Sequence, residues 1–83
     1  MMCNVDFRVV RICNMKIRYT LQKAQAKTGA ISYGIKVQQG SDAVFIKDIT
    51  SSFTAAHALF ESMVHGSVTP VTAKDIVEDW LLR

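Results

Sequence analysis

The sequence predicts an α+β fold: a three- to four-stranded antiparallel β-sheet, arranged as a meander and followed by two C-terminal α-helices packed on one face. Three observations predict it. Up to about residue 50, apolar residues alternate with polar or small ones, the period of two expected of half-buried strands. Turn-forming residues separate these alternating segments. Beyond residue 52, apolar residues recur at three- and four-residue spacing, as on one face of a helix.

Two interpretations fit the amino-terminal segment. Apolar residues alternate from Val5 to Val9, and Val10 and Ile12 continue on the opposite parity, which indicates a bulge near Val9 and Val10 or two short extended pieces. Alternatively, the protein starts at Met15 and the preceding residues are a dispensable leader.

The expected domain organisation follows from these two interpretations. Residues 15–83 form a single small α+β domain, and residues 1–14 are an N-terminal extension or an extra strand.

Three strands are predicted in the rest of the first half. Ile17, Tyr19 and Leu21 alternate with polar residues, which is typical of a strand with one buried and one solvated face. The segment 31–37 is predicted to be the central strand, and 43–49 the strand after it, so consecutive antiparallel pairing is the simplest topology.

The buried face of the last predicted strand is ambiguous. Val44 and Ile46 compete with Phe45 and Ile49 for the inside. If Val44 and Ile46 face the helices, Phe45 lies on the outer face of the sheet.

A first helix is expected from about Phe53 to His65. Ser52, or Ser51, is a plausible N-cap, because its hydroxyl can accept a hydrogen bond from an unpaired amide of the first turn. Gly66 lies where a left-handed C-terminal cap is expected.

A second helix is expected to start near Ala73. Thr72 and Asp75 have the spacing of a capping box, and Val71 and Ile76 have the spacing of a hydrophobic staple. The residues expected to supply most of the hydrophobic stabilisation are Tyr19, Leu21, Tyr33, Ile35, Val37, Leu59, Phe60, Ile76, Val77 and Trp80.

Cysteine usage and hydropathy bear on the compartment. Cys3 and Cys13 form neither a Cys-x-x-Cys pair nor the disulfide framework of small secreted domains. No apolar run approaches the roughly 18 residues that cross a bilayer. Asp6, Arg8 and Arg11 interrupt the apolar segments that a signal peptide would need. We therefore expect a cytoplasmic protein that does not contact a membrane.

Catalysis is not expected. A chain of 83 residues has a small core, in which a cleft with several buried polar groups is hard to fit. Ser62 and His65 are neighbours on the first predicted helix, but no acid accompanies them. The four glycines are isolated, so there is no glycine-rich phosphate loop. The sequence predicts no catalytic residue and no cofactor.

A metal site is not expected either. His57, Glu61 and His65 follow one another at four-residue spacing, and imidazoles and carboxylates are zinc ligands. The two histidines, however, are two helical turns apart, about 12 Å, too far for both to reach one ion. Ion pairing between Glu61 and either histidine is the expected arrangement.

Charge is divided unevenly along the chain. Residues 1–47 contain eight Lys or Arg and two Asp, a net charge of +6, whereas residues 48–83 contain two basic and five acidic residues, a net charge of −3. The predicted sheet is therefore basic and the predicted helices acidic. This division can mark a surface for an acidic partner, or two complementary faces of a self-associating or simply soluble domain.

The outer face of the sheet is the candidate surface. Arg18, Lys36 and Lys47, together with Phe45, would place cations and a stacking ring on one surface, the combination used by proteins that bind single-stranded nucleic acid. A solvated basic face, or one covered by a second subunit, is the alternative.

Four short motifs resemble those of a known family. They are Ser32-Tyr33-Gly34-Ile35, Asp48-Ile49-Thr50, Val68-Thr69-Pro70-Val71 and the run from Asp75 to Leu81 (Asp-Ile-Val-Glu-Asp-Trp-Leu). Together they look like a family of small, uncharacterised clostridial proteins carrying a domain of unknown function. The resemblance covers about Met15 to Leu81. It departs where Thr69 replaces Ser, Val71 replaces Ile and Trp80 replaces Phe. It implies a small α+β module and no activity.

These observations favour a non-enzymatic protein-interaction module. Its partner would be another protein or a second copy of the chain, bound through an exposed sheet edge or the outer sheet face. The alternative is a nucleic-acid-binding protein that uses the basic face of the sheet.

Overall fold

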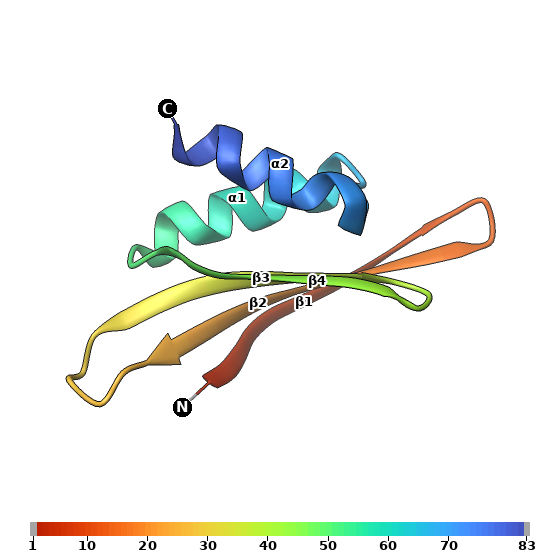
Figure 1. The fold of residues 1–83 in the computed structure, drawn as a ribbon. Helices are drawn as coiled ribbons and strands as arrows, with labels where there is room; N and C mark the ends of the chain where they lie inside the picture. Colours follow the sequence, from red (N-terminus) through yellow and green to blue (C-terminus); the bar gives the residue numbers. More distant parts are fainter. Residues whose placement is uncertain (1, 83) are drawn as a thin grey trace.

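The computed structural model describes residues 2–82 and has a two-layer α+β architecture (Figure 1). Its elements are β1 (Met2–Ile12), β2 (Met15–Gln25), β3 (Ile31–Gln39), β4 (Asp42–Thr50), α1 (Phe53–His65) and α2 (Pro70–Leu81). The strands pair antiparallel in the order β1-β2-β3-β4, and both helices lie on the same side of the sheet. The predicted fold class is confirmed, with four strands in the meander.

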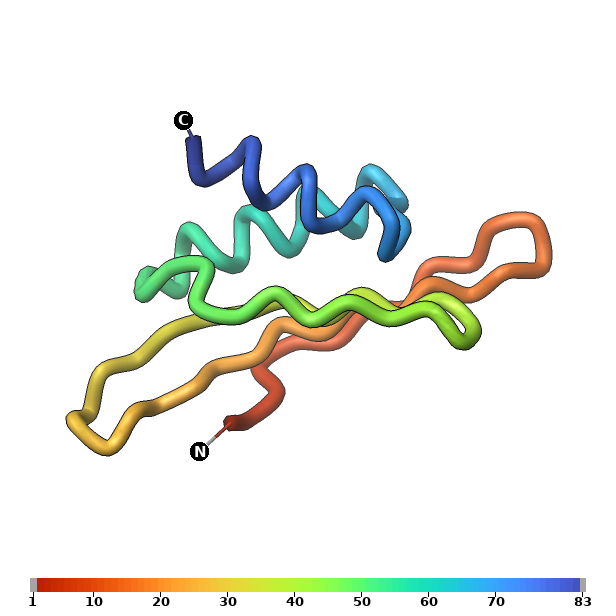
Figure 2. The backbone as a smooth tube through the Cα atoms, viewed as in Figure 1, coloured from red at the N-terminus to blue at the C-terminus, as the bar shows by residue number. Residues whose placement is uncertain are grey.

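The helices cover one face of the sheet and leave the other face uncovered. The sheet also extends beyond the helices at both of its ends. Figure 2 shows that the β1–β2 and β2–β3 hairpins extend beyond the helical layer in opposite directions. The β1–β2 turn has positive φ angles at both Cys13 and Asn14, as in the hairpin turns whose twist matches that of the flanking strands.

Edge strand β1 follows β2 along its whole length. Val9 and Val10 pair in regular register with Arg18 and Ile17, so the predicted bulge near these two valines is wrong. The register shift lies between Asn4 and Asp6 instead. The sequence pattern changes parity because apolar residues occupy both faces of this edge strand. Val9 lies on the exposed outer face, whereas Val10 packs against the core.

The helix-facing side of the sheet forms the core together with the two helices. Strands β2 and β3 contribute alternate residues, and α1 and α2 contribute one buried stripe each. The buried apolar residues are Ile17, Tyr19, Leu21, Tyr33, Ile35, Val37, Ile49, Ala56, Leu59, Phe60, Met63, Val68, Ala73 and Val77. Eight of the ten residues predicted for the core are in this set.

The two exceptions lie on α2. Trp80 is partly buried against the core, and Ile76 is 36% exposed. Helix α2 faces the sheet with Ala73 and Val77, so Ile76, one residue before Val77, lies on the flank of the helix.

Strand β4 directs both members of one predicted apolar pair toward the core and splits the other pair between the two faces of the sheet. Val44 and Ile46 pack against the core and Phe45 faces outward, opposite Lys36. Ile49 is buried as well. An irregularity between Ile46 and Thr50, with Asp48 at φ +54°, changes the parity of the strand so that residues 46 and 49 share a face.

The predicted caps of α1 are half right. The Ser52 hydroxyl accepts a hydrogen bond from the Ala55 amide at 3.3 Å, which confirms the N-cap. Gly66, however, keeps a right-handed helical conformation at φ −83°, and Ser67 at φ +52° adopts the left-handed one. The amides of Ser67 and Val68 then donate to the carbonyls of Val64 and Met63, which satisfies the end of the helix one residue later than predicted.

The predicted start of α2 is wrong by a turn. The helix begins at Pro70 with Thr69 as N-cap, so Thr72 lies inside the first turn and is not a capping residue. Its hydroxyl lies 3.3 Å from the Thr69 carbonyl. Val71 is 80% exposed and makes no hydrophobic staple. Proline suits the first helical position because its φ is preset and its missing amide is not needed there.

Candidate functional site

The uncovered face of the sheet gathers all four surface residues predicted from the sequence. Lys36 pairs directly with Phe45 across β3 and β4. Arg18 lies on β2 with the same parity, two residues from Thr20, which is the β2 partner of Lys36. The Lys47 ammonium lies 5.7 Å from the centroid of the Phe45 ring. We call this surface the outer face.

A fifth member, Phe7, was not identified from the sequence. It pairs with Thr20 on β2, which pairs with Lys36 on β3. The register therefore aligns Phe7, Thr20, Lys36 and Phe45 in one row across all four strands. The Phe7 side chain is 50% exposed, and the Arg18 guanidinium lies 5.8 Å from its ring centroid. The alternation around Phe7 is visible in the sequence, but the face it occupies depends on the β1–β2 turn at Cys13 and Asn14, from which the register runs unbroken to Phe7.

The two rings stand at opposite edges of the row. Three strand spacings separate β1 from β4, which places the rings about 14 Å apart. Between them lies a shallow hollow of about 200 Å³. Its lining is polar apart from one ring and consists of Asn4, Phe7, Arg18, Thr20, Gln22, Lys36 and Gln38.

The Phe45 ring depends on a glycine in the next strand. A Cβ atom at Gly34 would lie 3.1 Å from Phe45 Cε1 and 2.6 Å from the Ile46 carbonyl oxygen. The absence of a side chain at Gly34 therefore allows β4 and its ring to lie close to β3 on the outer face.

The charge division of the sequence becomes a division between two faces. Arg11, Lys16, Arg18 and Lys36 all have the outer parity of the sheet, and Lys47 contacts the Phe45 ring. Asp6 and Asp42 have the opposite parity. Among the described residues, Asp48 is the one carboxylate near this face, and it accepts a 2.7 Å hydrogen bond from Ser32. The exposed acids Asp75, Glu78 and Asp79 lie on α2, in the other layer.

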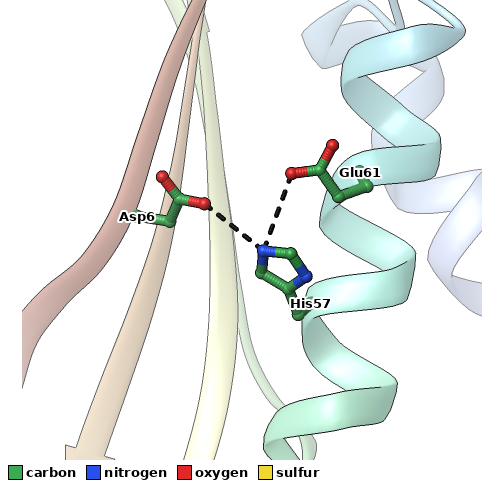
Figure 3. A group of neighbouring side chains, drawn as sticks. All are labelled: Asp6, His57 and Glu61. Atoms are coloured by element: carbon green, nitrogen blue, oxygen red, sulfur yellow. Dashed lines mark ion pairs between the residues drawn. The ribbon is translucent and has the colours of Figure 1, made fainter.

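A second cluster joins β1 to α1 on the helix-facing side (Figure 3). His57 Nε2 lies 3.4 Å from Asp6 Oδ2 and 3.6 Å from Glu61 Oε1. The Arg8 guanidinium lies 3.0 Å from the same Glu61 oxygen. His65 lies 3.7 Å from the other Glu61 oxygen. The predicted pairing of Glu61 with either histidine is therefore confirmed, and the structure places both histidines beside it. The sequence did not reveal Asp6 and Arg8, which come from a distant strand.

Asp6, His57 and Glu61 offer ligand atoms within 4.8 Å of one another, and each is a residue type that binds zinc. Arg8, however, already contributes a positive charge to the Glu61 oxygen that would ligate the ion. The geometry therefore fits an ion-pair network that links the edge strand β1 to α1. The expectation that no metal or cofactor is bound stays a prediction.

The two cysteines lie in solvent-exposed positions. Cys3 is on β1 and Cys13 is in the β1–β2 turn, and both are free thiols.

The expectation that the protein is not an enzyme stays a prediction.

In residues 2–82, none of the helices combines the length and the apolar character needed to cross a membrane.

Comparison with known proteins identifies the family. No curated protein and no solved structure matches the chain. A family model does match, over residues 1–83, and so includes the first fourteen residues that the motif resemblance did not cover. This chain belongs to DUF6514, a family of unknown function.

Proposed function

We propose that this protein is a non-enzymatic binding module whose binding surface is the outer face of the sheet and whose partner is negatively charged. One observation carries the proposal: five cations, Arg11, Lys16, Arg18, Lys36 and Lys47, gather around a face with a single carboxylate at its margin among the described residues. Clustered cations raise the local concentration of an anionic partner and accelerate its association.

The same charges argue against self-association through identical outer faces. A two-fold contact of this kind would place the five cations of one copy against the five of another, and like charges at an interface disfavour it.

The exposed edge of β1 is also a poor self-association surface. Asp6 and Arg8 point toward the helices, and the register shift at Val5 interrupts the regular ladder. Inward-pointing charges and bulges on an edge strand are features by which natural sheets resist edge-to-edge pairing.

A second candidate is an acidic protein surface. The exposed carboxylates Asp75, Glu78 and Asp79 on α2 have the sign that the outer face requires. A head-to-tail contact between copies would join these two different surfaces, and sedimentation at increasing protein concentration would detect it as salt-sensitive oligomers.

The proposal is tested with three polyanions: heparin, poly-L-glutamate and a single-stranded oligonucleotide, each titrated at several salt concentrations. The test variant carries Arg18→Glu, Lys36→Glu and Lys47→Glu. The matched control carries Lys23→Glu, Lys27→Glu and Lys74→Glu, which changes the net charge equally at positions away from the outer face.

The expected result is binding that weakens with salt, and a loss of affinity in the test variant much greater than in the control. The dependence of log K on log salt should become shallower by about one for each cation that no longer pairs with the polyanion. Equal loss in both variants would show a response to net charge alone. That result, or no binding to any of the three polyanions at low salt, would refute the proposal.

A further inference from the structure

We infer that the anionic partner is a single-stranded nucleic acid and that Phe7 and Phe45 each stack on one of its bases. The inference rests on the proposed function, since it assigns a ligand class to the same outer face.

The outer face contains two ring–cation pairs. Arg18 lies 5.8 Å from the Phe7 ring centroid, and Lys47 lies 5.7 Å from the Phe45 ring centroid. A base that stacks on a phenylalanine ring leaves its own phosphate close by, where the neighbouring cation can pair with it. Aromatic stacking combined with a cationic track is how single-stranded nucleic acids are bound without sequence preference.

The exposure of Phe7 supports a role in binding. Half of its side chain is accessible, on the face of the sheet that no helix covers. Its neighbour on that face, Val9, is also exposed, so an apolar patch lies within a basic surface. A base is flat and apolar on its faces and is linked to an anionic backbone, so it suits both parts of this surface.

The region between the rings offers polar groups rather than a third ring. Gln22 Nε2 donates a 2.9 Å hydrogen bond to Asn4 Oδ1, and Gln22 Oε1 has no hydrogen-bond partner. With Gln38 and Lys36, these carboxamides line the hollow. Carboxamides and ammonium groups form hydrogen bonds with base edges and sugars, so the nucleotides between the two stacked bases have partners there.

The spacing of the rings indicates one base for each ring. Stacked bases in a nucleic acid helix are about 3.4 Å apart, whereas the two rings are about 14 Å apart. The two stacked bases are therefore not adjacent, and a mononucleotide reaches only one ring. A duplex keeps its bases stacked on one another, so it can use the cations of the outer face but not the rings.

The experiment measures fluorescence anisotropy at near-physiological salt. The probes are labelled oligouridine and oligothymidine of increasing length and a duplex of matched length, with heparin and poly-L-glutamate as competitors. The variants are Phe7→Ala and Phe45→Ala, each with a leucine version that keeps apolar volume without a ring. Two controls are Val71→Ala, an exposed valine on α2 away from the outer face, and Phe53→Ala, a similarly exposed ring on α1 that contacts Tyr33 of β3.

The expected result is that each ring variant weakens single-strand binding about five-fold or more, because stacking on one ring contributes roughly 1–3 kcal/mol per base. Duplex binding and both control variants should be unchanged. A rise in affinity with oligonucleotide length, up to the length that spans both rings, is also expected. The uridine and thymidine probes decide between RNA and DNA.

The failures of the two proposals can be told apart. If heparin or poly-L-glutamate binds as tightly as the single strands and the ring variants bind normally, the inference is wrong while the proposed function stands. Tighter binding of the duplex than of the single strands would also overturn the inference. If none of the polyanions binds, both are wrong.

Discussion

The Tyr19 hydroxyl donates a 2.7 Å hydrogen bond to the main-chain carbonyl of Val68, which lies 49 residues away in the chain. Tyr19 is fully buried in β2, and Val68 lies in the connection between α1 and α2. The bond thus joins the sheet to the point where the helical layer reverses direction. It also satisfies a carbonyl that the surrounding apolar core could not satisfy.

Replacement of Tyr19 by Phe should destabilise the fold by about 1–3 kcal/mol, because it leaves the buried Val68 carbonyl without its partner while preserving the ring. Urea unfolding followed by circular dichroism measures the change. Tyr33→Phe is the matched control, since Tyr33 is a core tyrosine on the adjacent strand. Equal effects of the two substitutions would contradict a special role for the Tyr19 bond.

Stability should fall at alkaline pH for a reason that Tyr19→Phe removes. Burial raises the pKa of the Tyr19 phenol above its ordinary value of 10.0. Above about pH 10 the unfolded chain therefore loses this proton more readily than the folded chain, which favours unfolding. The contribution is complete below about pH 10 and disappears as pH rises through the folded pKa. Urea midpoints between about pH 8 and pH 11 should decline more steeply in the wild type than in the variant. Parallel curves would exclude this linkage.

The ion pairs between β1 and α1 should contribute modestly to stability. The Arg8–Glu61 pair is partly exposed, with relative side-chain exposures of 47% and 26%. Pairs of this kind typically contribute about 0.2–1 kcal/mol. A double-mutant cycle with Arg8→Ala and Glu61→Ala measures the coupling energy, and hydrogen exchange of the β1 amides reports whether the edge strand loosens. A coupling well above this range would show that the cluster is a major determinant of the fold.

Gly34→Ala should destabilise the protein and displace the Phe45 ring. The new Cβ would lie 2.6 Å from a backbone oxygen of β4, which cannot move as a side chain can, so a loss of about 1–3 kcal/mol is expected. Gly66→Ala is the control, because its nearest contact would be 3.3 Å and its φ is negative. Unfolding midpoints compare the two. If the proposed function and the further inference hold, Gly34→Ala should also weaken binding of single-stranded nucleic acid. A stability equal to that of the wild type would contradict the steric argument.

Short-range patterns were sufficient for the elements whose formation is local. The alternation in β2 and β3 predicted their buried faces correctly, because a strand that meets a core on one side shows a period of two. The span of α1 and its Ser52 cap were also predictable, since both depend on residues within one turn of each other.

The errors arose where two local signals compete. At the end of α1, a glycine and the serine after it were both available for the left-handed position, and the structure uses Ser67 because the amides of Ser67 and Val68 then reach the last carbonyls. At the start of α2, both Pro70 and Thr72 are signals of a helix start. The helix begins at Pro70, the earlier of the two, because Val68 and Pro70 are buried there.

The tertiary structure alone determined the composition of the two clusters. Phe7 joins Lys36 and Phe45 in one row only because the turn at Cys13 and Asn14 sets the β1–β2 register that pairs Phe7 with Thr20, the partner of Lys36. Asp6 approaches His57 only because α1 packs on the side of the sheet toward which Asp6 points. The alternation of a strand indicates which residues share a face, but the pairing of strands and the placement of helices decide which faces meet, and these depend on contacts between residues far apart in the chain.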